Sequence, residues 1–389
     1  MDETMLTLVF WLSLLLLIYI YLGYPVLAKA LAGLLHRSIN KDLEYQPAVT
    51  ILIAAYNEAG DIEATLQNKL DQDYPSDKLE LLVISDDSDD GTDEIVERVA
   101  ESARYPIRLF RQMPRQGKTA GLNTLVSEAK GEIILFSDAN SHWAADAISQ
   151  LVSNFADPEV GYVTGKMVYV NDDGTLVGDG CSAYMKYENW LREQETRIGS
   201  IVGVDGGIDA MRKTLYQPLR ADQLPDFVQP LKVVEQGYRV VYEPKALLEE
   251  KALEDSDSEF AMRVRVSLRA LWALKDMRHL MNPAGHGLFA LQLISHKWLR
   301  YYGFVSLAVF TLISTMLADR GGIYTLAFLG LIALYAMAWI GHLKEKKGRH
   351  LPPLYSIAYY FLLLNVSSLK AARGFWKGEK KVIWTPRQG

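Results

Sequence analysis

The sequence predicts an α/β domain with a mostly parallel central sheet, flanked at both ends of the chain by apolar helices that can enter a membrane. Between residues 46 and 280, short apolar runs alternate with helical patterns, a rhythm typical of parallel strands covered by helices. Apolar residues are concentrated at the two ends, and charged residues in the middle. Acidic and amide side chains directly follow the expected strands, where ligands bind in such sheets.

The amino-acid composition excludes several classes of function and of site for this protein. The 389 residues can form one large domain and a second unit. With 41 basic and 47 acidic residues the net charge is −6, so the chain lacks the basic character of a nucleic-acid-binding protein. The single cysteine, Cys181, excludes an intramolecular disulfide and a multi-cysteine zinc site. The seven scattered histidines do not suggest a metal cluster.

The N-terminal segment, residues 1–45, is expected to be a membrane anchor with its linker. Residues 6–22 carry no charge, and apolar character continues to residue 35, which is long enough to cross a bilayer. A cleavable signal peptide would have a basic start and a short apolar core, whereas this chain begins with Asp2 and Glu3. Arg37 and Lys41 follow the helix and favour a cytoplasmic position for the following domain.

The first half of the domain contains four expected strands, each ending in polar residues. They lie near residues 49–55, 79–84, 107–110 and 132–138, with helices near 62–70, 94–103 and 118–129 between them. The last strand ends at Asp138, and Asn140 follows. These two side chains can ligate a metal, or they can cap a following helix, because Asp and Asn are both good caps. The stretch alone leaves both interpretations open.

Two nucleotide-binding motifs are absent. Gly117-Lys118-Thr119 resembles the end of a P-loop, but Gln112 stands where its first glycine belongs. No Gly-x-Gly-x-x-Gly follows a strand either, so a P-loop kinase and a dinucleotide-binding fold have little support. The strand-end carboxylates are instead suited to a divalent cation or to the hydroxyls of a nucleoside, and Lys118 is suited to a diphosphate.

Four segments in this order resemble the nucleotide-sugar half of family 2 glycosyltransferases with the GT-A fold. They cover residues 54–58, 86–92, 117–123 and 137–140. The resemblance implies a donor site that binds the nucleoside and diphosphate through Ala55, Tyr56, Glu58, Asp86 and Lys118. It also implies that Asp138 and Asn140 hold Mg²⁺ or Mn²⁺. Asn140 stands where the family has a second aspartate, so we expect a heavier dependence on Asp138.

The acceptor half carries two further resemblances. Residues 204–212 are similar to the family's acceptor loop, in which Gly206 and Gly207 let a sugar approach the backbone. Residues 224–227, before the expected strand at 237–244, resemble the segment of the catalytic aspartate. This similarity makes Asp226 the expected general base, with helix capping as the alternative.

The basic helix expected at residues 259–280 bears on processivity. Processive polysaccharide synthases carry Gln-x-x-Arg-Trp near this position, and alignment on Arg265 puts Met262 and Val266 at the Gln and Trp positions. The chain therefore keeps Arg265, which the resemblance implies as a partner of the diphosphate. It lacks the Trp on which the acceptor stacks in processive synthases. For the other cations of this helix, we expect contacts with anionic lipid.

Membrane segments are expected in the C-terminal unit, residues 281–389. Residues 285–300 suit an interfacial helix, and residues 302–317 and 323–340 suit spans. The basic loop 342–350 favours the cytoplasm. The last apolar segment, 353–369, has basic residues on both sides, so crossing, re-entrant and interfacial arrangements all remain open.

The resemblance implies an inverting, metal-dependent enzyme of a bacterial inner membrane with a cytoplasmic catalytic domain at residues 46–280. Within the family, the sequence is similar to exopolysaccharide, cellulose and hyaluronan synthases. The implied partners are a nucleotide diphosphate-sugar, expected to be UDP-linked, a glycan or lipid acceptor and membrane lipids, with no nucleic acid. Transfer of a single sugar to a lipid is the alternative, followed by a membrane-anchored nucleotide sensor without catalysis.

Overall fold

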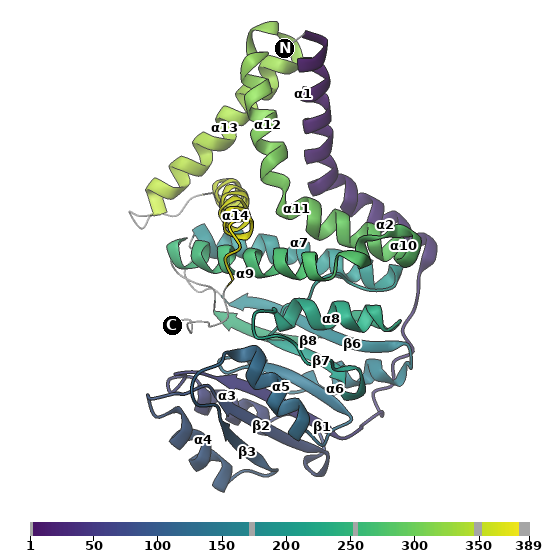
Figure 1. Cartoon of the computed structure of the whole chain (residues 1–389), viewed down its shortest axis with the longest axis vertical. Helices are drawn as coiled ribbons and strands as arrows, with labels where there is room; N and C mark the ends of the chain where they lie inside the picture. The colour runs from purple at the N-terminus through teal and green to yellow at the C-terminus, as the bar shows by residue number, and fades with distance from the viewer. Residues whose placement is uncertain (1–2, 171–175, 252–255, 346–351, 381–389) are drawn as a thin grey trace.

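The computed structural model describes residues 3–170, 176–251, 256–345 and 352–380. Part of the predicted basic loop 342–350 and the end of the basic tail lie outside these ranges. Figure 1 shows an α/β domain at one end, a layer of helices across it, and upright helices at the other end. The predicted segregation of apolar ends and charged middle therefore corresponds to a physical separation along the long axis.

The first half of the sheet is parallel, as predicted. Four strands lie in the order β3-β2-β1-β4, and every residue of β1 and β2 is buried, which explains their continuous apolar sequences. The strands are β1 (Val49–Ala55), β2 (Leu79–Ser85), β3 (Ile107–Arg111) and β4 (Ile133–Asp138). The helices between them are α3 (Ile62–Leu70), η2 (Ser76–Lys78), α4 (Thr92–Glu101) and α5 (Lys118–Glu128).

The second half continues the same sheet in the order β4-β7-β6-β8-β5. β7 is antiparallel to both β4 and β6, β6 is parallel to β8, and β5 is antiparallel to β8. The strands are β5 (His142–Trp143), β6 (Val160–Val170), β7 (Ile208–Arg212) and β8 (Arg239–Lys251). The helices are α6 (Ala147–Ser153), η3 (Asn154–Ala156), α7 (Leu176–Ile198), η4 (Lys213–Leu215), α8 (Pro225–Glu235), α9 (Ser256–Asp276) and η5 (Arg278–Met281).

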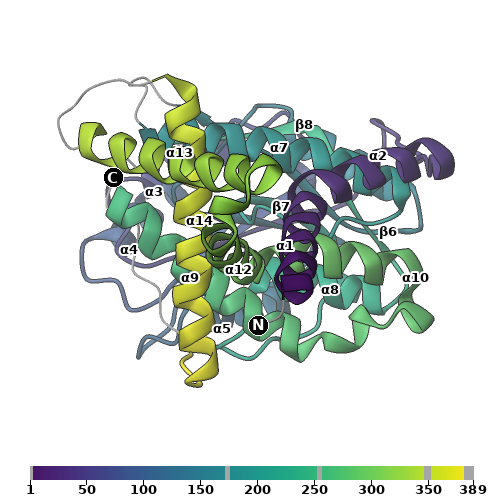
Figure 2. The same cartoon turned by 90° about the horizontal axis from the view of Figure 1, so that it is seen from above.

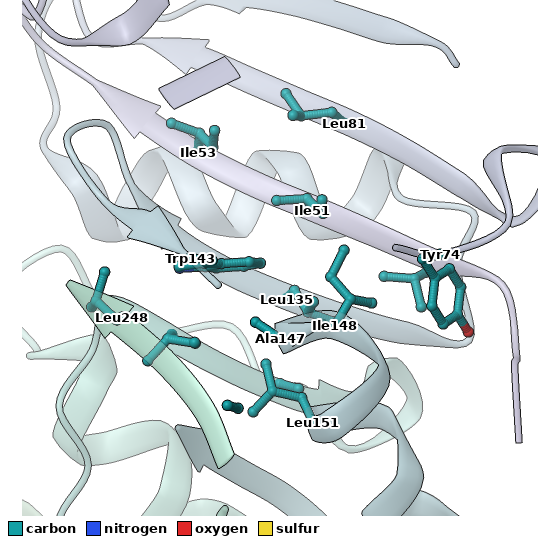
Figure 3. Close-up of a cluster of buried hydrophobic side chains, with 14 of the residues drawn as sticks. Ile51, Ile53, Tyr74, Leu81, Leu135, Trp143, Ala147, Ile148, Leu151 and Leu248 are labelled. Atoms are coloured by element: carbon teal, nitrogen blue, oxygen red, sulfur yellow. The ribbon is translucent and has the colours of Figure 1, made fainter. Parts of the chain in front are cut away.

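Apolar clusters fill both faces of the sheet. One face packs against α3 and α6, where Ile51, Leu135 and Ile148 are fully buried (Figure 3). The opposite face packs against α5 and α8 through residues such as Leu125 and Val233. Burial on both faces fixes the positions of the strand ends and of the helix N-termini that follow them.

Two helical stretches near the ends of the chain are long and apolar enough to cross a membrane within the described residues. One is the stretch Glu3–Leu35 and the other Gly322–Lys344, in agreement with the predicted anchor and the later span. A further pair, Pro283–Tyr301 and Gly303–Met316, meets the same criterion only together and is bent by 56°. The elements are α1 (Glu3–Ile18), η1 (Tyr19–Gly23), α2 (Tyr24–Leu35), α10 (Pro283–Gln292), η6 (Leu293–Trp298), α11 (Leu299–Tyr301), α12 (Gly303–Met316), η7 (Ala318–Arg320) and α13 (Gly322–Glu345).

The last helix, α14 (Pro353–Trp376), lies across α9 when viewed from above (Figure 2). Tyr360, Leu363 and Ala371 on one side are buried, whereas Ile357 and Val366 are exposed. It is not among the described helices that are apolar enough to cross. Of the arrangements left open by the sequence, this geometry favours the interfacial one.

Candidate active site

Asp138 and Asn140 lie in a turn that no helix follows directly. The Ser141 amide donates to the Asp138 carbonyl at 3.3 Å, β5 comes next, and α6 begins only at Ala147. The helix-capping interpretation of Asp138 and Asn140 is therefore wrong. The Asp138 side chain is 43% exposed at the carboxyl end of β4, so its oxygens are accessible to a ligand.

Lys118 connects Asp138 to Asp226. As the first residue of α5, it donates from Nζ to Asp138 Oδ1 at 2.5 Å, and the same Nζ lies 3.9 Å from Asp226 Oδ1. Burial acts to lower the pKa of Lys118, but Asp138 and Asp226 outweigh it and raise that pKa above its usual value. The site thus contains a permanent positive charge between two carboxylates that are far apart in the sequence.

Asp226 lies in the first turn of α8 and does not cap it. The capping position belongs to Leu224, and Pro225 is the first helical residue. Burial raises the pKa of the Asp226 carboxyl, Lys118 opposes this, and Asp138 adds to it. A carboxylate made more basic, with 28% of its side chain exposed, is suited to accept a proton.

The loop before β7 passes between the two aspartates. Gly206 has φ +94°, and a methyl group there would lie 2.7 Å from Asp226 Cγ. At Gly207 a methyl group would lie 2.7 Å from Leu248 Cδ2 and 3.8 Å from Asp138 Oδ2. Both positions therefore require glycine. Their predicted contact with an acceptor stays a prediction.

Gly206→Ala is expected to lower turnover by roughly 100-fold, because the methyl group displaces Asp226, and a displacement of about 1 Å costs on that order. Gly237→Ala is the matched control, since Gly237 has φ +88° but no atom within 4 Å of its added methyl group. In both variants alanine must adopt a positive φ, which lowers the stability of the protein by about 1–2 kcal/mol. Turnover and thermal stability are measured together. Equal activity of the two variants would rule out the displacement.

Asp86 organises the loop that leads to Lys118. Its buried carboxylate accepts hydrogen bonds from Gln112 Nε2 at 2.5 Å, from the Gln116 amide at 2.8 Å and from the Gly117 amide at 3.0 Å. Arg115 pairs with it at 3.2 Å and lies 3.3 Å over the Tyr56 ring. The structure thus brings Asp86 and Tyr56 together through Arg115. Their contact with a nucleoside stays a prediction.

Glu58 follows β1 beside other carboxylates. Burial raises its pKa to about 7, and Asp61, Asp138 and Asp90 each add to the shift. Ala55 is the buried last residue of β1. The strand order brings the predicted donor residues to one edge of the sheet, as expected for neighbouring parallel strands.

Two arginines of α9 reach the same site. Burial lowers the pKa of the Arg265 guanidinium, and Asp138 opposes that shift. Arg269 donates from NH2 to the Gln223 carbonyl at 2.6 Å, and the charge of Asp226 acts on it. The sequence assigned Arg269 to lipid contacts, which this geometry contradicts. Its spacing of four residues from Arg265 places both on one helix face and was the signal that could have revealed it.

Several known proteins are similar to this chain in sequence or in fold. The model of glycosyl transferase family 2 matches residues 50–217. The matched residues lie in the α/β domain, so this part of the chain resembles that family. Poly-beta-1,6-N-acetyl-D-glucosamine synthase of Staphylococcus aureus is 27% identical over 281 residues, which are 67% of this chain and 66% of that protein. The chain thus spans slightly less than two thirds of the length of that relative.

Two further proteins are similar to this chain. Beta-monoglucosyldiacylglycerol synthase of Trichormus variabilis is 29% identical over 169 residues, covering 43% of this chain and 36% of that protein. The solved mannosyltransferase PcManGT from Pyrobaculum calidifontis, in complex with GDP-Man and Mn²⁺, has a TM-score of 0.73 and 24% identity. That similarity covers 95% of this chain and 100% of the solved one, and it confirms the predicted GT-A fold.

The oxygen atoms of this candidate site fit a divalent cation only in part. No group of three or more His, Cys, Asp and Glu residues suited to a metal occurs in the described part of the chain. The partly exposed Asp138 carboxylate and the amide of Asn140 in the same turn offer oxygen atoms only, which Mg²⁺ and Mn²⁺ accept. Phosphate oxygens and water complete such sites, so these residues fit a metal bound together with a diphosphate.

A buried carboxylate that the sequence did not reveal lies in the α/β domain at Asp209. This residue of β7 is fully buried, and burial raises its pKa from 3.8 to about 8, with Asp226 and Asp205 adding to the shift. The carboxyl group is therefore protonated at neutral pH in the folded protein. It lies in a strand whose apolar surroundings gave no sign of a titrating group.

Asp209→Asn is expected to remove a pH-dependent loss of stability. The folded pKa lies above the unfolded one, so folding takes up a proton between about pH 4 and about pH 8. The contribution of Asp209 to stability therefore falls as the pH rises through this window, by at most about 1.4 kcal/mol per pH unit. The difference in Tm between the variant and the wild type should increase from about pH 5 to about pH 8 and then level off. Parallel curves would contradict the assignment.

Proposed function

We propose that this protein is a membrane-bound, inverting glycosyltransferase that moves a sugar from a nucleotide diphosphate-sugar to a glycan or lipid acceptor. The observation that carries the proposal is the position of Lys118, 2.5 Å from Asp138 Oδ1 and 3.9 Å from Asp226 Oδ1. This arrangement joins a cation suited to a diphosphate to a carboxylate suited to deprotonate an acceptor. A nucleotide sensor needs the first group and has no use for the second.

On the donor side, Ala55, Tyr56 and Glu58 contact the nucleoside, and Asp86 holds the adjoining loop while contributing to the same pocket. Lys118 and Arg265 bind the diphosphate through charge-assisted hydrogen bonds. Asp138 and Asn140 hold Mg²⁺ or Mn²⁺, which when bound neutralises charge on the leaving diphosphate. UDP is the proposed nucleotide.

On the acceptor side, Gly206 and Gly207 let the acceptor hydroxyl approach between the two aspartates. Asp226 takes the hydroxyl proton as the oxygen attacks the anomeric carbon. The bond from that carbon to the diphosphate oxygen breaks, and the diphosphate leaves with the electron pair, stabilised by Lys118 and Arg265. A single displacement of this kind inverts the anomeric configuration.

The membrane helices and the similar proteins support the acceptor class. By their names, one relative is a synthase of a polysaccharide and another a synthase of a glycolipid, so both glycan and lipid acceptors are proposed. The absence of the Gln and Trp around Arg265 favours a product shorter than that of processive synthases. Arg37 and Lys41 after the first span, which lie next to the α/β domain, support a cytoplasmic catalytic domain in a bacterial inner membrane.

Donor screening tests this function. Full-length protein in phospholipid vesicles is incubated with UDP- and GDP-linked sugars and Mn²⁺, and nucleotide release is measured. We expect release from one donor class, its loss with a chelator, and inverted configuration of the product by NMR. Binding of Mn²⁺ and nucleotide without release from any donor would instead support the sensor.

A further inference from the structure

A buried tryptophan connects the loop that carries the two proposed metal ligands to the acceptor loop. Trp143 is 3% exposed and lies near Leu135, Ala147 and Leu248 on the face of the sheet shown in Figure 3. Its indole Nε1 donates to the Gly207 carbonyl at 2.9 Å. A buried indole N–H generally finds some acceptor, so this bond alone could be ordinary packing. The contacts of Trp143 and of the loop that ends at Gly207 indicate that the bond also has a positioning role.

The backbone of Trp143 is fixed on α3. Asn68 accepts a hydrogen bond from the Trp143 amide at 2.8 Å and donates to the Trp143 carbonyl at 2.9 Å. Lys69, which is fully buried, donates to the Ser141 carbonyl at 2.7 Å and lies 4.2 Å from the centre of the Trp143 ring. Residues 141–143, which directly follow Asn140, are thus held from one side by a rigid helix.

The acceptor loop is held at both ends. From α7, Arg192 donates to the Gly203 carbonyl at 3.2 Å and to Asp205 Oδ2 at 2.5 Å. At the other end, Gly207 accepts from Trp143 and approaches the metal loop so closely that a methyl group on it would lie 3.1 Å from Ser141 Oγ. Loss of the Trp143 bond should therefore release one end of the loop while Arg192 retains the other.

We propose that Trp143 is a positioning residue, whose indole N–H fixes the acceptor loop against the turn that carries Asp138 and Asn140. The inference rests on the proposed function. It adds how the acceptor loop is held in position relative to the turn with the proposed metal ligands. The bond lies in the buried interior, where leaving a carbonyl without its hydrogen-bond partner has a free-energy cost. That cost is enough to shift the loop without unfolding the domain.

The test compares Trp143→Phe with Trp272→Phe in the full-length protein. Phenylalanine keeps an aromatic ring next to Lys69 and removes the N–H. Trp272 is a matched control, since its Nε1 donates to the Glu379 carbonyl at 2.8 Å in an exposed hydrogen bond between α9 and the residues that follow α14. Hydrogen–deuterium exchange of residues 204–207 is measured first, because it needs no substrate. We expect roughly 10-fold faster exchange in W143F and no change in W272F.

Kinetics supply the second measurement. The acceptor is whichever probe the wild type glycosylates, dioleoylglycerol in phosphatidylglycerol vesicles or a β-1,6-linked N-acetylglucosamine tetramer. In W143F we expect the acceptor KM to rise roughly 10-fold, with kcat and donor hydrolysis without acceptor within about 2-fold of wild type. A general structural defect would lower these rates and stability together.

The outcomes separate the two proposals. Exchange and acceptor KM unchanged in W143F, in a protein whose wild type transfers sugar, would overturn the role of Trp143 alone. Equal losses of kcat and donor hydrolysis would also overturn it. A wild type that transfers sugar to neither probe and releases nucleotide from no donor would end the proposed function, and the exchange result would still decide whether Trp143 holds the loop.

Discussion

Asp226→Asn is expected to lower sugar transfer by roughly 10²- to 10⁴-fold, the usual contribution of a general base. Asparagine keeps the shape of the side chain next to Gly206 but cannot take the acceptor proton. Lys118 keeps its bond to Asp138, so we expect donor binding to persist. Transfer is measured by nucleotide release with acceptor, and donor affinity by calorimetry with Mn²⁺ and the donor.

Asp222→Asn is the control for this substitution. Asp222 precedes α8 on the same segment but pairs with Arg220 at 3.1 Å and with Lys380, outside the site. It should keep near wild-type transfer. If Asp226→Asn retained most of its turnover while it bound donor, another group would have to act as the base. Loss of donor binding along with turnover would make Asp226 a donor-site residue.

The positions of the strands could be predicted because their sequences are buried on both faces. Such strands read as continuous apolar runs ending in polar residues, as at Asp138, and their parallel order brings those ends to one edge. The direction of β7 could not be predicted, since its pairing with β4 and β6 depends on contacts distant in sequence. The packing of α14 on α9 could not be predicted either, because it also depends on contacts between residues distant in the sequence.

The residues of the candidate site could be predicted one at a time from the sequence. The contacts between them could not. Motifs identified Lys118, Asp138 and Asp226 separately, but the bonds between them follow from the convergence of α5, β4 and α8. Arg269 was assigned to lipid although it follows Arg265 by four residues and so lies on the same face of the helix. Trp143 looked like an apolar residue, and its indole bond to Gly207 appears only when β5 and the loop before β7 are brought together.

Asp138→Asn is expected to abolish most metal-dependent activity, with a loss of at least roughly 10²-fold, because it removes the charged member of the proposed ligand pair. It also removes the negative charge that pairs with Lys118 Nζ at 2.5 Å. Asp138 acts to raise the pKa of Asp226, so removing its charge should lower that pKa. The acid limb of the residual pH–rate profile should then move to lower pH.

Asn140→Asp provides the complementary test at the same turn. The added carboxylate should tighten Mn²⁺ binding, since affinity in oxygen sites rises with the number of charged ligands. We expect the Mn²⁺ concentration for half-maximal nucleotide release to fall in N140D and to rise or become unmeasurable in D138N. Nucleotide release is titrated with Mn²⁺ at saturating donor. If both variants kept the wild-type midpoint, the metal would bind elsewhere, and Lys118 with the arginines of α9 would have to stabilise the leaving diphosphate without it.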